Sequence, residues 1–328
     1  MFREKGFRKR LKERKLNEKE IDFAVSSVRE FLEYLEKKKV PFGTASLDLL
    51  KEYLSFLIDG GRNSTDRLLA IARYCYFAEK NDYYVHFTAI MNGREILPLI
   101  GKKLVDIAGK ETWQRIFHGF ELPPLGSPPD DYPKLTKMIV DRLETELPVA
   151  ACREVLTGNY HEIPAEAFED KKERFCKAKS IDDYLKGEHK RLVVELTTFM
   201  RKGRIWYEQQ ITPEVVEFVK RNPEIQNGVR RGNKIYVTKI PYAPSEYIRE
   251  EDPTLKRYYA CHCPLARTSI RDGKPKIPSV FCYCSGGFEK FAFDTIFGQP
   301  TEVELLESAL KGDPRCRFAI TIPEGKMK

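Results

Sequence analysis

The sequence predicts an α+β protein whose helices come first and whose strands come late. Apolar residues recur at helical spacing through the first third of the chain, whereas residues 234–240 alternate as a strand does. Two further strand-like runs, 301–310 and 317–322, flank the turn residues 312–314. We therefore expect a helical N-terminal domain, followed by an α/β C-terminal domain that ends in a β-hairpin.

Chain length and one proline-rich stretch predict the domain organisation. At 328 residues and 38.1 kDa the chain exceeds what one hydrophobic core usually holds. Residues 121–134 contain five prolines, which is typical of a linker or a long surface loop. We expect a helical bundle at 1–120 and an α/β cysteine-rich domain at 135–328.

The expected helices rest on capping residues and apolar stripes. Asn17 followed by Glu20 has the arrangement of a helix N-cap, and an apolar stripe follows at Ile21, Val25, Val28, Leu32 and Leu35. Serine or threonine precedes several later stripes, and Gly60 and Gly61 end one of them. Further helices are predicted at 46–59, from 63 onward, and at 93–108, 110–118, 135–147, 152–156, 180–201 and 213–221.

The positive charge is concentrated at the N-terminus. Residues 1–15 carry eight Lys or Arg and two Glu, and so supply +6 of the net charge of +8. Such an arm could neutralise nucleic-acid phosphates, but we favour a solvated, frayed leader. The helix spacing of residues 16–85 resembles the core-binding domain of tyrosine recombinases. No His-x-x-Arg box accompanies it, so we interpret these helices as a scaffold or partner-binding module.

Five of the eight cysteines fall in the last 68 residues, at Cys261, Cys263, Cys282, Cys284 and Cys316. In an extended segment the alternate side chains share one face, so each Cys-x-Cys pair can direct both sulfurs to one point. Two pairs could supply four thiolates to a tetrahedral metal ion, with Cys316 as a further candidate. We expect zinc, with an iron–sulfur cluster as the alternative.

A reactive thiol is the second interpretation of the same cysteines. Ser285 could cap a helix and leave Cys284 at its positive end, where the pKa of a thiol falls. In an enzyme, Cys284 would then be the nucleophile and His262 its catalytic partner. Without enzymatic activity, His262 is expected to face away from the sulfurs and to support the site. Cysteines that only fill the core are the third interpretation.

Composition excludes several classes of function. No apolar run is long enough to cross a membrane, and none follows a basic start as in a signal peptide. We therefore expect a cytoplasmic protein with reduced thiols. Phosphate-binding Gly-rich loops, His-Glu-x-x-His and Gly-x-Ser-x-Gly are absent from the sequence, so nucleotide, zincin and serine esterase chemistry have no support.

Residues 287–322 resemble the C-terminal part of the 4-vinyl reductase, or hydrocarbon-binding, domain. The shared pattern is a Cys leading into a helix, an acidic and apolar strand, a Gly-Asp turn, and Cys-Arg-Phe at 316–318. The resemblance implies an α/β ligand-binding domain that is often a homodimer. Sensor members of that family hold zinc through cysteines and a Glu.

That resemblance also assigns metal ligands. Cys316 and one cysteine of the 282/284 pair match ligand positions of the sensors. Ser308 and Leu305 stand where those sensors carry another Cys and the Glu. The pair at 261 and 263 is therefore expected to replace the missing ligands.

Residues 150–325 also resemble an uncharacterised bacterial and archaeal family that is distantly similar to L-2-amino-thiazoline-4-carboxylic acid hydrolases. The shared marks lie at 159–164, 206–209 and 239–242 and in both cysteine pairs. The first functional hypothesis is a small-molecule binding or sensing protein, for a small hydrophobic or thiol-reactive ligand, in which the metal braces the pocket. The alternatives are a thiol- or metal-dependent hydrolase and a nucleic-acid-binding protein.

Overall fold

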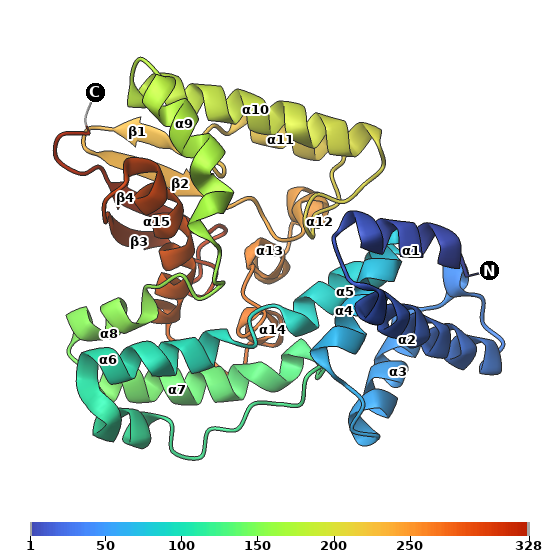
Figure 1. The fold of residues 1–328 in the computed structure, drawn as a ribbon. Coiled ribbons are helices and arrows are strands. Elements are labelled where there is room, and N and C mark those ends of the chain that lie inside the picture. The colour runs from blue at the N-terminus through green and yellow to red at the C-terminus, as the bar shows by residue number, and fades with distance from the viewer. Residues whose placement is uncertain (1, 327–328) are drawn as a thin grey trace. The chain divides into compact units, whose positions relative to one another are not determined.

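The computed structural model describes residues 2–326 and has the predicted α+β fold, with helices α1–α15 and strands β1–β4 (Figure 1). The chain divides into two compact units. Unit 1 comprises residues 1–94 and 121–131, and unit 2 comprises residues 95–120 and 132–328. The domain limits expected from the sequence, 1–120 and 135–328, stay a prediction.

Unit 1 is a helical bundle. Its helices are α1 (Glu4–Glu13), α2 (Glu18–Lys37), α3 (Leu47–Asp59), α4 (Thr65–Phe77) and α5 (Asn81–Met91). The expected cap at Asn17 is confirmed: its side chain accepts from Glu20 N, and the Glu20 carboxylate accepts from Asn17 N. Ser46 and Ser64 cap α3 and α4 in the same way.

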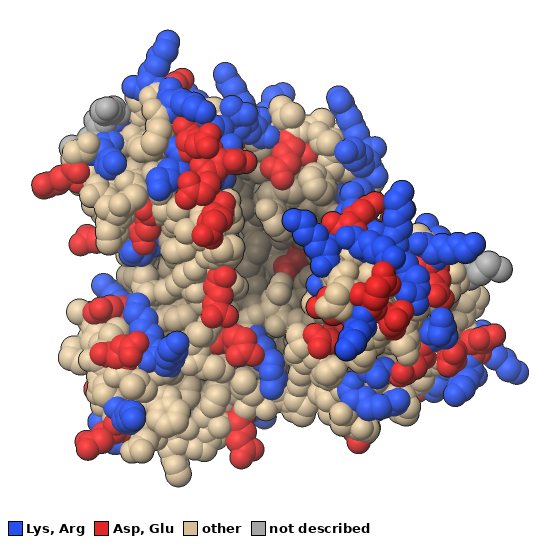
Figure 2. Space-filling model, in the orientation of Figure 1, with Lys and Arg blue, Asp and Glu red and all other residues tan. Residues whose placement is uncertain are grey.

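The expectation of a frayed N-terminal leader is wrong, because residues 4–13 form helix α1. Phe7 and Leu11 lie one helical turn apart and are almost fully buried against α2 and α4. Three of the five basic side chains of α1 are paired with acids: Arg8 with Glu4 and Asp22, Arg10 with Glu13, and Lys12 with Glu18. On the face shown in Figure 2, Lys and Arg alternate with Asp and Glu over α1 and α2.

Unit 2 contains the remaining helices. They are α6 (Ile96–Ile116), α7 (Tyr132–Glu146), α8 (Val149–Leu156), α9 (Glu169–Lys177), α10 (Ile181–Arg201), α11 (Pro213–Arg221), α12 (Pro244–Arg249), α13 (Pro253–Ala260), α14 (Arg267–Asp272) and α15 (Tyr283–Phe297). The two helices expected at 93–108 and 110–118 form α6, which kinks at Gly109 (φ 83°). Helices α12–α14 are too short for an apolar stripe to reveal them.

The strands of unit 2 form one antiparallel sheet of order β1-β2-β4-β3. They are β1 (Val229–Arg231), β2 (Lys234–Thr238), β3 (Glu302–Glu307) and β4 (Arg317–Thr321). The C-terminal hairpin is confirmed as the β3–β4 pair. β3 is shorter than the predicted 301–310 because a register shift at Leu305 and Glu307 ends the regular pairing.

Helix α15 packs on this sheet through a glycine. A Cβ atom on Gly286 would lie 3.3 Å from the Phe318 ring and from a Val303 methyl group, so a larger residue would fit only if these side chains moved by a few tenths of an ångström. Phe293, Ile296 and Phe297 continue the contact into a core shared with β2 and β4. Helix α15 thereby lies against β3 and β4 (Figure 1), and Lys239, the residue after β2, donates to Ser285 in its first turn.

Substitution of Phe7 with Ala tests whether α1 is an integral part of unit 1. Phe7 has no exposed surface, so its truncation should lower the free energy of unfolding by about 3–5 kcal/mol. Lys9→Ala, on the exposed face of the same helix, should change it by less than about 0.5 kcal/mol. Chemical denaturation measures both variants. Equal stabilities would contradict the packed α1.

Candidate functional site: a buried cysteine cluster and its charged neighbours

The structure brings the five predicted cysteines into one region of unit 2. Cys261 ends α13, Cys263 lies in the following loop, and Cys316 directly precedes β4. Cys282 caps α15, and Cys284 lies in its first turn. The thiol of Cys263 interacts electrostatically with those of Cys261, Cys282 and Cys284, and the Cys282 thiol also interacts with that of Cys316. All eight cysteines of the chain are free of disulfides.

The strand register positions Cys316. Thr238 of β2 pairs with Arg317 of β4, and one residue further on Lys239 N donates to Cys316 O at 3.0 Å. Glu224 holds this corner of the sheet through two hydrogen bonds from Arg317, at 2.8 and 3.0 Å. Antiparallel pairing therefore places Lys239 and Cys316 side by side although 77 residues separate them (316 − 239).

The two cysteine pairs differ in backbone geometry, and only the first begins in an extended conformation. Cys261 has extended dihedrals, with φ −79° and ψ 120°. Cys282 and Cys284, by contrast, span the junction of a 3₁₀ helix and α15. The condition of an extended segment is therefore not met by the second pair, and residues two apart in a helix point to different sides. Cys282 instead interacts with the hydroxyl of Ser308, the position suggested by the resemblance to zinc sensors.

The donor chemistry of this cluster suits a thiophilic metal ion, because several thiols lie together away from water. In the structure, however, the cysteine side chains are not arranged as the ligands of a bound metal ion would be. Among residues 2–326, no group of three or more His, Cys, Asp or Glu side chains stands in positions that could hold a metal ion. Metal coordination therefore requires these side chains to turn from the positions described here.

Burial keeps the thiols protonated. It raises the pKa of both Cys261 and Cys284 to about 12, and the pKa values of Cys263 and Cys282 lie well above the usual value for the same reason. Lys239 opposes the shift at Cys284 without cancelling it. The expectation that the helix end lowers the pKa of Cys284 is wrong, because the thiol is desolvated within the first turn of α15.

Lys239 connects the cluster to a buried carboxylate. Its ammonium nitrogen donates to Ser285 Oγ at 3.0 Å, lies 3.6 Å from Glu289 Oε1, and sits over the Phe288 ring. Glu289 is 5% exposed, and Oε1 has no hydrogen-bond partner in the part of the chain that the structure describes. Burial raises the pKa of Glu289, against the attraction of Lys239 and Lys171.

Two histidines of this region, His262 and His161, each pack edge-on against an aromatic ring. His262 Nε2 lies 2.6 Å from the carbonyl oxygen of Ile240, so this nitrogen donates and the ring faces Tyr242 rather than the sulfurs. Burial lowers the pKa of His262 to about 3, so the imidazole is neutral at physiological pH. His161 packs edge-on against Phe288. The loop that carries His161 packs closely on α15 at Gly158. A Cβ atom on Gly287 would lie only 2.4 Å from Gly158 N, so only glycine at position 287 permits this contact.

Sequence reasoning missed the charged members of the site. Lys239 falls within the predicted strand 234–240, and Arg267 follows the first cysteine pair by four residues, but neither position carries a local signal of a site. Glu289 was missed, although a carboxylate between Phe288 and Phe291 in a phenylalanine-rich run is a signal of a buried functional group. Lys171, partly buried on α9, has no comparable signal.

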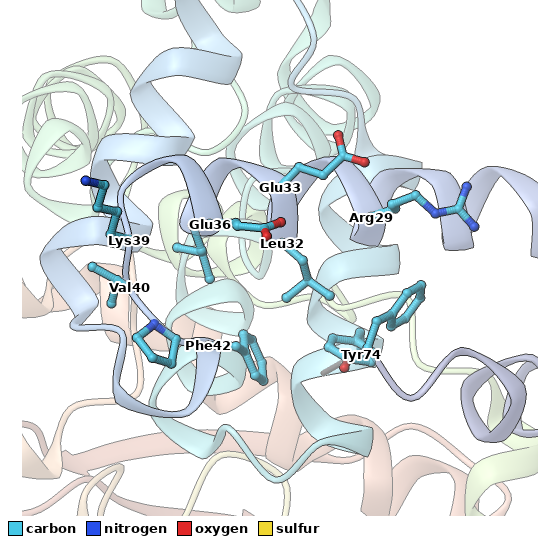
Figure 3. Close-up of a pocket in the computed structure, with 11 residues that line it drawn as sticks. Arg29, Leu32, Glu33, Glu36, Lys39, Val40, Phe42 and Tyr74 are labelled. Carbon is cyan, nitrogen blue, oxygen red and sulfur yellow. The ribbon is translucent and has the colours of Figure 1, made fainter.

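A separate pocket lies in unit 1. It has a volume of about 630 Å³ and is lined by residues of α2, by Tyr74 of α4 and by the segment 39–42. Leu32, Phe42 and Tyr74 point toward the cavity, while Glu33 and Lys39 point away from it (Figure 3). It is thus an apolar hollow with charged residues at its rim.

Fold and site together define an α+β protein with a buried cluster of thiols beside a lysine–glutamate pair. The model of a family of unknown function, DUF6144, matches residues 243–327, the segment that carries all five clustered cysteines. No curated protein and no solved structure matches the chain. Over residues 2–326, none of the helices combines the length and apolar character needed to cross a bilayer.

Alkylation rates test the raised thiol pKa values. With a pKa of about 12, only about one Cys284 thiol in ten thousand is ionised at pH 8. In metal-free folded protein, iodoacetamide should label Cys284 on the order of a thousandfold more slowly than the exposed Cys176. Peptide mass spectrometry reports each site. Rapid labelling of Cys284 at pH 6 would show a low-pKa thiol instead.

The pH dependence of stability tests the burial of Glu289. Its pKa in the folded state is raised, so its stabilising contribution is complete below the unfolded-state pKa of about 4.3 and is lost as pH rises through the folded-state pKa. Glu289→Gln should therefore match wild type near pH 4 and become progressively more stable than wild type toward pH 8. Glu302→Gln, at an exposed position of β3, serves as the control and should show no such divergence in urea unfolding. Parallel curves for Glu289→Gln and wild type would mean that Glu289 is solvated.

Proposed function

We propose that this protein binds or senses a small molecule through unit 2, and that its cysteine cluster holds a soft metal ion that braces the site. Zinc is the first choice, and an iron–sulfur cluster is the alternative. The observation that carries the proposal is the convergence of five mutually interacting thiols from three separate segments of the chain. Core packing alone gives no reason for so many sulfurs to meet.

The burial of uncoordinated thiols is unfavourable, and this favours the binding of a metal cation by the cluster. Polar thiols gathered in a buried region gain little as weak hydrogen-bond donors, whereas thiolates bound to a metal ion gain strong coordination bonds. Binding displaces thiol protons, so affinity should rise with pH. Lys239, which interacts electrostatically with Cys284 and Cys261, supplies positive charge that balances an anionic metal–thiolate group.

The wider features of the proposal follow from the sequence. The resemblance of residues 287–322 to hydrocarbon-binding domains supports a small hydrophobic or thiol-reactive ligand and a homodimer. Free cysteines favour a reducing cytoplasm. Nucleic-acid binding through unit 1 is not favoured, since acidic residues pair with much of the basic charge of α1.

A second candidate, a thiol-dependent hydrolase, is favoured by one observation. Lys239 contacts Ser285 and Glu289 and interacts electrostatically with Cys284, so a cation that favours the thiolate and a carboxyl group stand near a nucleophilic atom. Its difficulty is that the pKa of Cys284 is raised to about 12, so the thiol needs activation by its substrate or by Lys239. His262, neutral and bonded to Ile240 O, would act only as a positioning residue.

Metal analysis of untagged protein purified without added metal tests the main proposal. We expect about one equivalent of zinc or a matching iron–sulfur content per chain. Cys261→Ser and Cys282→Ser, one from each pair, should lower metal affinity at least about tenfold, because a serine hydroxyl stays protonated. Chelation should also lower the melting temperature of the wild type.

Cys176→Ser is the matched control, since Cys176 is exposed and outside the cluster. It should retain its metal and its melting temperature. Less than about 0.2 equivalents of any transition metal in wild-type protein, before and after reconstitution, would reject metal binding.

A further inference from the structure

Arg267, the first residue of α14, is a buried cation without a carboxylate partner. The residue is 8% exposed. Its guanidinium carbon lies 3.8 Å from the centre of the Tyr242 ring and 5.3 Å from that of Tyr258. Within residues 2–326, no acidic side chain forms an ion pair with it, so aromatic faces supply its nearest electrostatic contacts.

Two polar atoms on neighbouring residues have no hydrogen-bond partner. They are Arg267 Nε and the hydroxyl of Thr268, both buried in the described part of the chain. The Tyr242 hydroxyl interacts with the Arg267 guanidinium itself and has no further partner there. Thr268 is 4% exposed. Buried donors are nearly always satisfied in folded proteins, so open donors on Arg267 and on its neighbour Thr268 indicate a missing acceptor.

The nearby groups do not supply that acceptor. The Cys261 thiol interacts electrostatically with Arg267, but it affects the pKa of Arg267 less than Tyr242 and Tyr258 do. Burial also keeps that thiol protonated, so it adds no negative charge. Lys239 is positive and acts on His262 together with Arg267. Glu208 acts electrostatically on Tyr242, but it does not appear among the groups that shift the pKa of Arg267. Within the described residues the guanidinium therefore has no carboxylate partner of its own.

We infer that Arg267, together with the hydroxyls of Tyr242 and Thr268, binds a small oxyanionic group, either a carboxylate or a phosphate. A guanidinium held flat against an aromatic ring keeps its N–H edge available for two parallel hydrogen bonds to such a group. The two hydroxyls add donors beside it. This assignment rests on the proposed small-molecule function and specifies its ligand as an anion.

Direct titration tests the site. Sodium acetate and inorganic phosphate are titrated into full-length protein by calorimetry at constant ionic strength, with sodium chloride as the reference. We expect at least one of the two anions to bind at millimolar concentration, and the one that binds identifies the planar or the tetrahedral group. Arg267→Met should weaken this binding at least tenfold, and Arg267→Lys should weaken it less.

Arg249→Met is the matched control, because Arg249 is an exposed arginine on the neighbouring helix α12. It should bind the anion as wild type does. Absence of binding by both anions to wild type, or equal binding by Arg267→Met, would overturn the inference. If Arg267→Met does not fold, unchanged affinity in Arg267→Lys for both anions overturns it, and a changed affinity supports it.

Metal content measured on the same samples separates the two proposals. Protein that retains its metal but binds neither anion rejects the Arg267 site alone. Protein that binds an anion through Arg267 without containing metal supports the Arg267 site and rejects the metal centre alone.

Discussion

The antiparallel pairing of β2 with β4 is the constraint on which the site depends. It sets Lys239 beside Cys316, and the Gly286 contact then seats α15 on the same sheet, with Cys284, Ser285 and Glu289 at its N-terminal end. The ion pairs of Glu224 with Arg317 and Arg231 hold the register at this corner. A one-residue slip would turn every side chain of β4 to the opposite face and disperse the cluster.

Burial rather than helix polarity decides the chemistry of the cluster. The positive end of α15 and Lys239 both favour a thiolate at Cys284, yet desolvation dominates and the thiol stays protonated. A protonated, enclosed sulfur is a poor nucleophile and a latent metal ligand. The same balance applies to Glu289, whose pKa is raised although Lys239 and Lys171 attract its charge. Burial thus disfavours the charged forms of both the thiols and Glu289 unless a cation or a ligand compensates them.

Local sequence signals identified much of the fold. The cap at Asn17 and the apolar stripe after it correctly located α2, and the turn at 312–314 correctly predicted the β3–β4 hairpin. The N-terminal helix α1 was missed because its charge suggested solvation, whereas Phe7 and Leu11 bury one face. Helices α12–α14 were missed because six to eight residues give too short a periodic pattern.

The sequence by itself determined the α+β class and pointed to the five clustered cysteines, since both are written in residue type and spacing. Only the tertiary structure decided what surrounds those sulfurs. Lys239, Glu289 and Arg267 come from a strand end and from two helices, and nothing local in the sequence marks them as neighbours. Their roles arise from desolvation and from contacts between distant segments, which depend on packing rather than on any run of residues.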